Sequence, residues 1–233
     1  MANGIVRVGL VGAGGKTRLR HAPGFRDQSG VEIVSVANRS RESGERFAGE
    51  FEIPKVYDSW VDLINADDTD AICIGTWPYM HRTLTLAALE AGKHVLCEAR
   101  MAMNAKEAHD MLDASRLKPH LIAQIVPAPS TLDVDSTIQG LIADGYLGEI
   151  LAVKLRVSNT EGRANRNDTF VDTEAPFHWR QNQLLSGYNA MSMGIWYEQL
   201  MRYVGPASKV SAMTKVCVRQ RLDENGVMRA VSV

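Results

Sequence analysis

Short β-branched runs alternate with helix-forming stretches along the first half of the chain, and this alternation constrains the fold more than any other feature. Strands that alternate with helices at this spacing indicate βαβ units, and so a parallel sheet covered by helices on both faces. The crossovers between such strands are right-handed. The predicted strands cover residues 5–11, 32–37, 55–57, 71–76, 94–97 and 121–126, and the predicted helices cover 41–51, 60–66, 81–91 and 105–117.

The pattern changes near residue 127, where two prolines follow the last of these strands. We therefore predict two domains, 1–127 with the doubly wound sheet and 128–233 with a smaller α+β arrangement. The overall fold class is α/β. In the second domain we predict helices at 134–144 and 188–204, strands at 149–159, 209–219 and 227–233, and a polar surface loop at 160–173.

Composition excludes several classes of protein. The 233 residues are 45% hydrophobic and 23% charged, with a net charge of −1, so no basic excess points to nucleic acid or to an anionic membrane surface. No apolar run approaches the roughly 18 residues of a membrane span, and no signal peptide is visible. The cysteines Cys73, Cys97 and Cys217 lack metal-binding spacing. We expect a cytoplasmic protein without a metal site, whose thiols serve as small core residues.

A glycine-rich turn follows the first predicted strand. Gly12 and Gly14 occupy the first two positions of a G-x-G-x-x-G fingerprint, and Thr17 stands at the third. The first glycine permits a tight turn and the second lets the backbone approach a pyrophosphate, which then meets the amides of a helix start. Pro23 predicts that this helix starts late. The turn predicts dinucleotide binding; the alternative is a glycine turn without a ligand.

The end of the second predicted strand indicates which dinucleotide is bound. An acid at this place accepts hydrogen bonds from the ribose of NAD and repels the 2′-phosphate of NADP. Here the sequence has Asn38, Arg39 and Ser40, and the guanidinium of Arg39 can pair with a phosphate. This favours NADP over NAD as the cofactor. The alternative is that Arg39 and Ser40 form only a solvated helix start, with Ser40 as its N-cap.

The order of these motifs resembles that of the Gfo/Idh/MocA oxidoreductases, the glucose–fructose oxidoreductase and inositol dehydrogenase superfamily. The resemblance implies an N-terminal Rossmann domain and a C-terminal domain with an open sheet, here truncated. It also implies a nicotinamide cofactor and a small-molecule substrate related to a sugar or polyol. The matching stretches are GLVGAGGKTRLRHAPGF, DAICIGTWPYMH, AALEAGKHVLCEARMAMNAKEA, DGYLGEI and GIWYEQLMRYVG, and they cover nearly the whole chain.

The resemblance assigns cofactor contacts residue by residue. The pyrophosphate would be lined by the glycine turn, the adenosine ribose would face the end of the second strand, and Glu98 would lie by the nicotinamide ribose. The alternatives are that His81 only starts a helix and that Glu98 only bonds to backbone amides. The implied cofactor-binding residues are Gly12, Gly14, Gly15, Lys16, Asn38, Arg39, Ser40, Thr76, Trp77, His81 and Glu98.

The sequence departs from the family where the family's catalytic residues lie. In place of the family's Glu-Lys-Pro it has Glu98-Ala99-Arg100. Ala99 cannot move a proton, and Arg100 keeps its charge, so it can orient a substrate but cannot act as a base near neutral pH. The family's peptide bond at this place is often cis. Because cis costs roughly 2.5–4 kcal/mol before a residue other than proline, we predict a trans Ala99–Arg100 bond.

A second departure lies in the predicted helix of the C-terminal domain. The family's Asp-x-Gly-x-His pattern reads Ser192-Met193-Gly194-Ile195-Trp196 here. Polar candidates for proton transfer or substrate contact are Arg100, His178 and Tyr188. The alternative is that these groups satisfy one another at a domain interface.

Two functions remain open from the sequence. The first is an NAD(P)-dependent oxidoreductase, NADP-preferring, that transfers hydride to or from a sugar- or polyol-like substrate. The second is a dinucleotide-binding protein without dehydrogenase activity, such as a sensor or degenerate family member. Lyase or hydrolase chemistry that uses the nicotinamide transiently also occurs in the family.

The end of the sequence bears on its association. Family members continue further at the C-terminus, and a sheet that stops here would expose an edge. An artificially shortened chain, a naturally short reading frame and an edge paired in an oligomer all stay open. If the short form is native, we expect a homo-oligomer that associates through the C-terminal sheet.

Overall fold

The computed structural model describes residues 4–127, 134–156, 174–188 and 193–233. The chain divides into two compact units, the first comprising Met1–Pro127 with Leu184–Gly187 and the second comprising Ala128–Gln183 with Tyr188–Val233. Each unit is described by itself. The predicted loop at 160–173 lies outside the described residues.

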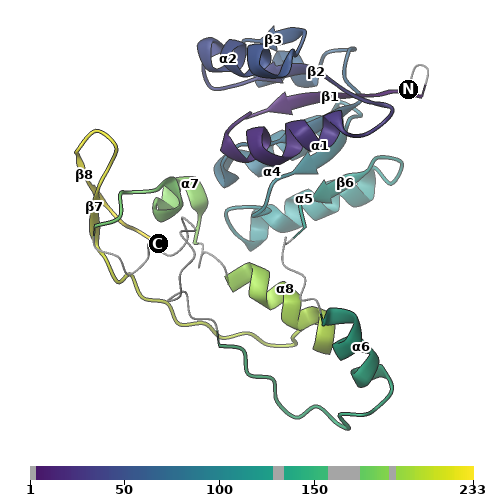
Figure 1. Ribbon diagram of the computed structural model, residues 1–233, viewed down its shortest axis with the longest axis vertical. Helices are drawn as coiled ribbons and strands as arrows, with labels where there is room; N and C mark the ends of the chain where they lie inside the picture. Colours follow the sequence, from purple (N-terminus) through teal and green to yellow (C-terminus); the bar gives the residue numbers. More distant parts are fainter. Residues whose placement is uncertain (1–3, 128–133, 157–173, 189–192) are drawn as a thin grey trace. The chain divides into compact units, whose positions relative to one another are not determined.

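The first unit is built on a six-stranded parallel sheet. Its strand order is β3-β2-β1-β4-β5-β6, which runs from β3 at the top of Figure 1 to β6 below. This is the doubly wound order, with the switch point between β1 and β4, so the predicted α/β class is confirmed. The strands are β1 (Val6–Val11), β2 (Val31–Ala37), β3 (Lys55–Tyr57), β4 (Ala71–Ile74), β5 (His94–Cys97) and β6 (Ala123–Ile125).

Helices cover both faces of this sheet. Helix α2 begins after Ser40, whose hydroxyl accepts a hydrogen bond from the Ser43 amide, and α5 begins after Asn104, whose side chain caps the Glu107 amide. The helices of this unit are η1 (Thr17–His21), α1 (Ala22–Arg26), α2 (Arg41–Phe51), α3 (Trp60–Ile64), η2 (Pro78–Met80), α4 (His81–Glu90) and α5 (Ala105–Leu117).

The helix after the glycine-rich turn does not start late, so the prediction based on Pro23 is wrong. Helical backbone begins at Gly15 and continues into α1. The turns of η1 are wider, of π type, and Pro23 lies in the first turn of α1. A proline is tolerated in the first turn of a helix, and the π-type turns before it change the hydrogen-bond register there.

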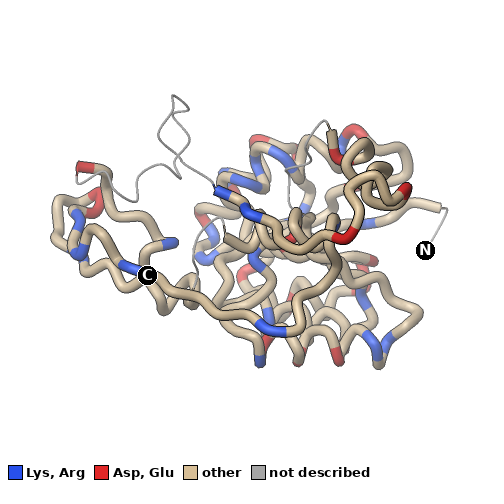
Figure 2. The backbone as a smooth tube through the Cα atoms, turned by 90° about the horizontal axis from the view of Figure 1, so that it is seen from below, with Lys and Arg blue, Asp and Glu red and all other residues tan. Residues whose placement is uncertain are grey.

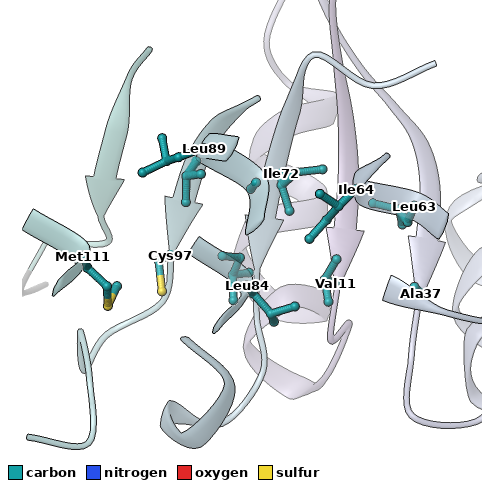
Figure 3. Packing of buried hydrophobic residues seen from close by; sticks show 12 residues of the cluster. Val11, Ala37, Leu63, Ile64, Ile72, Leu84, Leu89, Cys97 and Met111 are labelled. Atoms are coloured by element: carbon teal, nitrogen blue, oxygen red, sulfur yellow. The ribbon is translucent and has the colours of Figure 1, made fainter. Parts of the chain in front are cut away.

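Alternating strand residues divide the core into two layers. On one face Val11, Ile72 and Cys97 pack with residues of α3, α4 and α5, as Figure 3 shows for Leu63, Leu84 and Met111. On the other face, residues of β1, β2 and β4 pack with α1 and α2; the buried members are Val8, Leu10, Ala13, Ala22, Val36, Phe47, Ala48, Ile53 and Cys73. Burial on both faces explains why the strands read as continuous apolar runs.

Two cysteines lie inside these layers. Cys73 and Cys97 are both buried, and burial raises the pKa of each thiol, that of Cys97 to about 12. Both thiols are therefore protonated near neutral pH and behave as small core residues.

An ion pair joins β1 to the residue before β4, near the amino ends of the strands. The Asp70 carboxylate accepts hydrogen bonds from the Arg7 amide and from two nitrogens of its guanidinium, at 2.8–2.9 Å. The hydrogen bonds and charge of Arg7 outweigh burial and hold the pKa of Asp70 at about 2. Because this pair lies away from the carboxyl ends of the strands, it contributes to stability and not to a ligand site.

Asp70→Asn is expected to destabilise the chain at pH 7 by about 1 kcal/mol, near the upper end for a solvent-screened ion pair. A carboxylate with a depressed pKa adds stability that is present above its unfolded value of about 3.9 and is lost as the pH falls towards about 2. Urea unfolding at several pH values measures this. The gap between wild type and variant should close below pH 4; a gap of constant size would contradict the assignment.

The second unit contains helices, a hairpin and extended chain. The Asp135 carboxylate, at the start of α6, accepts hydrogen bonds from Gln199 and Tyr203 of α8, which ties the two helices together. The elements of this unit, together with α7 at its boundary, are α6 (Asp135–Ala143), η4 (Trp179–Gln181), α7 (Gln183–Ser186), α8 (Met193–Val204), β7 (Gln220–Leu222) and β8 (Met228–Ala230), and Figure 1 shows β7 and β8 as an antiparallel hairpin.

Two predicted strands of the second unit are wrong over the residues that the structure describes. Residues 149–156 and 209–219 form no ladder with a described strand. Their apolar side chains made them read as strands. Residues 150–153 instead line an apolar groove of about 350 Å³ with α8. A strand needs a hydrogen-bonded neighbour, which a local pattern cannot supply.

Charges are interspersed along both units. Lys and Arg segments alternate with Asp and Glu segments along the tube in Figure 2, in agreement with the net charge of −1. No described helix has the length and apolar character needed to cross a membrane.

Candidate functional site

The carboxyl ends of the strands bring the first unit's polar motifs together, beginning with the glycine-rich turn. Gly12 has a φ of +82°, and a Cβ there would meet Thr76 at 2.5 Å from Cγ2 and 2.7 Å from N. A Cβ on Gly75 would lie 2.3 Å from the Thr17 hydroxyl and 2.6 Å from the Gly12 carbonyl oxygen. The turn after β1 and the chain after β4 thus interlock at the switch point. This contact leaves no room for side chains at Gly12 or Gly75.

The next two glycines face open space. A Cβ on Gly14 or Gly15 would meet nothing within 4 Å. The first helical hydrogen bond runs from the Arg18 amide to the Gly14 carbonyl, so the three preceding amides point beyond the helix start. An open backbone before a helix N-terminus suits a phosphate group. Thr17, at the third fingerprint position, is 1% exposed. Its hydroxyl donates a hydrogen bond to the Gly12 carbonyl, which stabilises the turn.

Asn38 supports this turn from the end of β2. Its Oδ1 accepts a hydrogen bond from the Ala13 amide at 2.6 Å, and its amide nitrogen donates to the Ser43 hydroxyl. The side chain that the sequence assigns to the ribose is therefore directed at the glycine-rich turn. Ser40 is the N-cap of α2, which agrees with the alternative interpretation of that residue.

Arg39 and Trp77 form a cation–π pair across the switch point. Strands β2 and β4 flank β1, so their ends lie about 10 Å apart. The guanidinium carbon of Arg39 nonetheless lies 5.6 Å from the centre of the Trp77 ring, because both side chains are long. The structure thus brings together two predicted cofactor residues at the end of the crevice where a Rossmann fold binds adenosine.

Glu98 follows β5 and is held by a residue of the glycine-rich stretch. One carboxylate oxygen lies 2.7 Å from Nε2 of His21 and the other accepts the Ala99 amide. Burial alone would raise the pKa of Glu98, but the hydrogen bond and charge of His21 outweigh it and keep the pKa low. Lys16 adds to this effect at longer range. Glu98 is therefore a carboxylate in the folded chain.

His81 lies beneath the site and not in it. Its ring is fully buried, with Nδ1 2.8 Å from the Arg100 carbonyl and Nε2 2.9 Å from the Thr76 carbonyl. Burial lowers the pKa of this histidine, although both carbonyl contacts act in the opposite direction. The side chain links the chain after β4 to the turn after β5. It braces the site and leaves no ring edge for a ligand.

The Ala99–Arg100 peptide bond is cis, so the prediction of a trans bond is wrong. The prediction used only the intrinsic preference of the peptide bond and not the contacts of the turn. In the structure the Arg100 carbonyl contacts the His81 ring, and the Glu98 side chain contacts His21 and the Ala99 amide. Ala99 presents only a methyl group at the place where the resemblance expects a lysine.

The remaining candidates belong to the second unit. His178 caps the short helix η4, with its Nδ1 accepting the Arg180 amide at 3.3 Å. Tyr188 is 82% exposed. The described residues contain no group of three His, Cys, Asp or Glu side chains that could hold a metal ion.

Sequence reasoning missed two residues of the site. His21 is the one histidine of the glycine-rich stretch, so its residue type could have drawn attention to it. Its partner Glu98, however, lies far away in sequence. Gly75 sits directly after the fourth strand, and its close contact with Gly12 depends on the packing of two loops. Neither contact has a local pattern that would reveal it.

A family model described as "Oxidoreductase family, NAD-binding Rossmann fold" matches residues 6–124. Trans-1,2-dihydrobenzene-1,2-diol dehydrogenase from Bos taurus is 30% identical over 230 residues, covering 99% of this chain and 62% of the relative. 1,5-Anhydro-D-fructose reductase from Ensifer adhaerens is 40% identical over 110 residues, covering 47% of this chain and 33% of the relative. The chain thus spans about three fifths of the length of the dehydrogenases that it matches end to end.

Solved structures share the fold. An NAD binding oxidoreductase from Klebsiella pneumoniae has a TM-score of 0.74 at 22% identity, covering 98% of this chain and 61% of that one. A mutant 3-ketoreductase from Actinomadura kijaniata, in complex with TDP-benzene and NADP, has a TM-score of 0.55 at 24% identity, covering 63% of this chain and 44% of that one.

Proposed function

We propose that this chain, which belongs to the Gfo/Idh/MocA oxidoreductase family with an NAD-binding Rossmann fold, binds NADP in preference to NAD. We further propose that it transfers hydride between that cofactor and a sugar- or polyol-like substrate. The observation that carries this is the convergence of the open glycine turn, the Arg39–Trp77 pair and Glu98 at one sheet edge.

The residues present fit a nicotinamide dinucleotide. The open backbone at Gly14 and Gly15 leaves space for a pyrophosphate, next to the helix start. The Thr76 hydroxyl, buried at the switch point, has no hydrogen-bond partner among the described residues. Such a group usually has a partner, which a bound ligand or a water would provide.

The charges around the adenosine end favour NADP. No acidic side chain stands at the end of β2, where an acid would repel a 2′-phosphate. Arg39 is exposed and carries the fixed positive charge that a phosphate pairs with. The neighbouring Arg41 is engaged by Glu45 and Asp58 instead.

The chain's own residues then have distinct roles. Glu98 orients the nicotinamide ribose through its carboxylate, which His21 holds in place. His81 keeps the chain after β4 and the turn after β5 at a fixed separation. The bound nicotinamide supplies hydride transfer, and Arg100 offers a permanent positive charge that can polarise a carbonyl oxygen.

A second candidate is a dinucleotide-binding protein without dehydrogenase activity. Ala99 favours it, because the family's lysine normally stands at this place beside the reacting hydroxyl. Cofactor binding alone does not distinguish the two candidates, because both need the same nucleotide site.

Thermal unfolding with added nucleotides tests the proposal. We expect NADP and NADPH at 1 mM to raise the melting temperature more than NAD and NADH do, because a ligand that binds only the folded state stabilises it by mass action. A larger shift with NAD would contradict the assignment of Arg39. Turnover is then assayed with trans-1,2-dihydrobenzene-1,2-diol, myo-inositol and 1,5-anhydro-D-fructose. Binding without turnover of any of them supports the second candidate, and no shift with any nucleotide overturns both.

A further inference from the structure

Arg39 and Trp77 follow two residues that are both anchored to the glycine-rich turn. The Asn38 side chain accepts an amide of that turn at 2.6 Å. The Thr76 backbone packs so closely on Gly12 that a Cβ on this glycine would lie 2.7 Å from the Thr76 nitrogen. The backbone positions from which the two long side chains extend are therefore fixed relative to each other.

The backbone of Trp77 is restricted on its other side as well. The buried Pro78 follows it and confines it to extended backbone, and its φ of −78° and ψ of 157° lie in that region. The Trp77 carbonyl accepts the Met80 amide at 3.1 Å, at the start of η2. The indole ring is half-buried and turns about only two side-chain torsions. Trp77 thus presents an aromatic face whose position is set by the fold.

Arg39 is the mobile partner of this pair. Its side chain is exposed, and no described carboxylate lies within ion-pair distance of it. The guanidinium carbon lies 5.6 Å from the centre of the Trp77 ring, a contact that attracts the cation to the aromatic face. This contact takes up none of the five N–H donors of the guanidinium. The donors stay available for a phosphate group, which the planar guanidinium can bind through two of them.

We propose that Trp77 is a positioning residue for the 2′-phosphate of NADP, which acts by holding the Arg39 guanidinium at the adenosine end of the site. A long exposed side chain loses rotamer freedom when it binds a ligand, and that loss weakens binding. The aromatic contact restricts the guanidinium before the nucleotide arrives, so less freedom is lost on binding. This inference rests on the proposed function and deepens it, because it makes the preference for NADP depend on a residue that follows β4.

A double-mutant cycle on Arg39 and Trp77 tests the inference, with isothermal titration calorimetry of the full chain against NADP and NAD. We expect Trp77→Leu to weaken NADP binding by about three- to tenfold, the effect of leaving one long side chain unrestrained. NAD lacks the 2′-phosphate, so its affinity should change by less than about twofold on the same grounds. In an Arg39→Ala background, Trp77→Leu should weaken NADP binding no further, because the residue through which it acts is gone.

Two further variants separate positioning from a general effect on the fold. Trp77→Phe keeps an aromatic face with a weaker attraction for cations, so its NADP affinity should lie between those of wild type and Trp77→Leu. Tyr79→Leu is the matched control, because Tyr79 is an aromatic residue of the same segment, 42% exposed, that lies in η2. Both of its nucleotide affinities should stay within about twofold of wild type, as for a surface substitution that removes no buried contact.

The outcomes distinguish this inference from the proposed function. Unchanged or tighter NADP binding in Trp77→Leu, an equal loss for NADP and NAD, or a full further loss in the Arg39→Ala background each overturns the role of Trp77. In all three cases a wild-type chain that prefers NADP keeps its proposed cofactor. If the wild-type chain binds neither nucleotide or prefers NAD, the proposed cofactor fails and the role of Trp77 fails with it. A loss that is specific to NADP and depends on Arg39 supports the inference.

Discussion

Gly12→Ala is expected to lower the free energy of unfolding by about 2–4 kcal/mol, from left-handed backbone and forced overpacking together. Gly12 has a φ of +82°, and its Cβ would lie 2.5 Å from Thr76 Cγ2 and 2.7 Å from Thr76 N. The second contact is with backbone, which cannot rotate away. Because this contact sets the spacing of the two loops to which we assign the proposed cofactor, stabilisation by NADPH should also be lost. Urea unfolding with and without NADPH measures both effects.

Gly14→Ala is the matched control for this prediction. A Cβ there meets nothing within 4 Å, and Gly14 is not among the glycines with positive φ. We expect its unfolding free energy to change by less than about 1 kcal/mol, as for a substitution that removes no buried contact. Nucleotide binding should nevertheless weaken, because the added methyl group occupies the surface that a pyrophosphate approaches. If both variants lost stability equally, the interlock at Gly12 would not be its cause.

Arg39→Ala is expected to weaken binding of NADP by about 10- to 100-fold, the loss of one charge-assisted hydrogen-bonded pair. The affinity for NAD, which lacks the 2′-phosphate, should change by less than about threefold on the same grounds. Titration followed by Trp77 fluorescence provides the measurement, because Arg39 lies over the indole ring of Trp77.

Arg41→Ala provides the comparison. Arg41 lies two residues further along, but its guanidinium is bound by Glu45 and Asp58. We expect its NADP affinity to stay within about twofold of wild type, because a surface ion pair contributes little. Equal losses in both variants would mean that general positive charge, and not a specific contact of Arg39, attracts the nucleotide.

Local patterns predicted the first unit well because its strands are buried on both faces and its helices carry recognisable ends. The helix ranges 41–51 and 105–117 and the strand ranges 55–57 and 94–97 agree with the structure. The pattern failed at 149–156 and 209–219, where strand-like residues find no described partner strand. Pairing is a long-range property, which a local pattern of apolar residues cannot supply.

The sequence by itself determined the doubly wound sheet and the place of its binding edge, because βαβ periodicity and a glycine turn after the first strand act over short distances. It also determined that Ala99 stands where the resemblance expects a lysine. Only the tertiary structure decided the cis bond at Ala99–Arg100, the burial of His81 between two carbonyl groups and the contact of His21 with Glu98. These features join residues that are far apart in sequence, so the packing of the crossovers sets them.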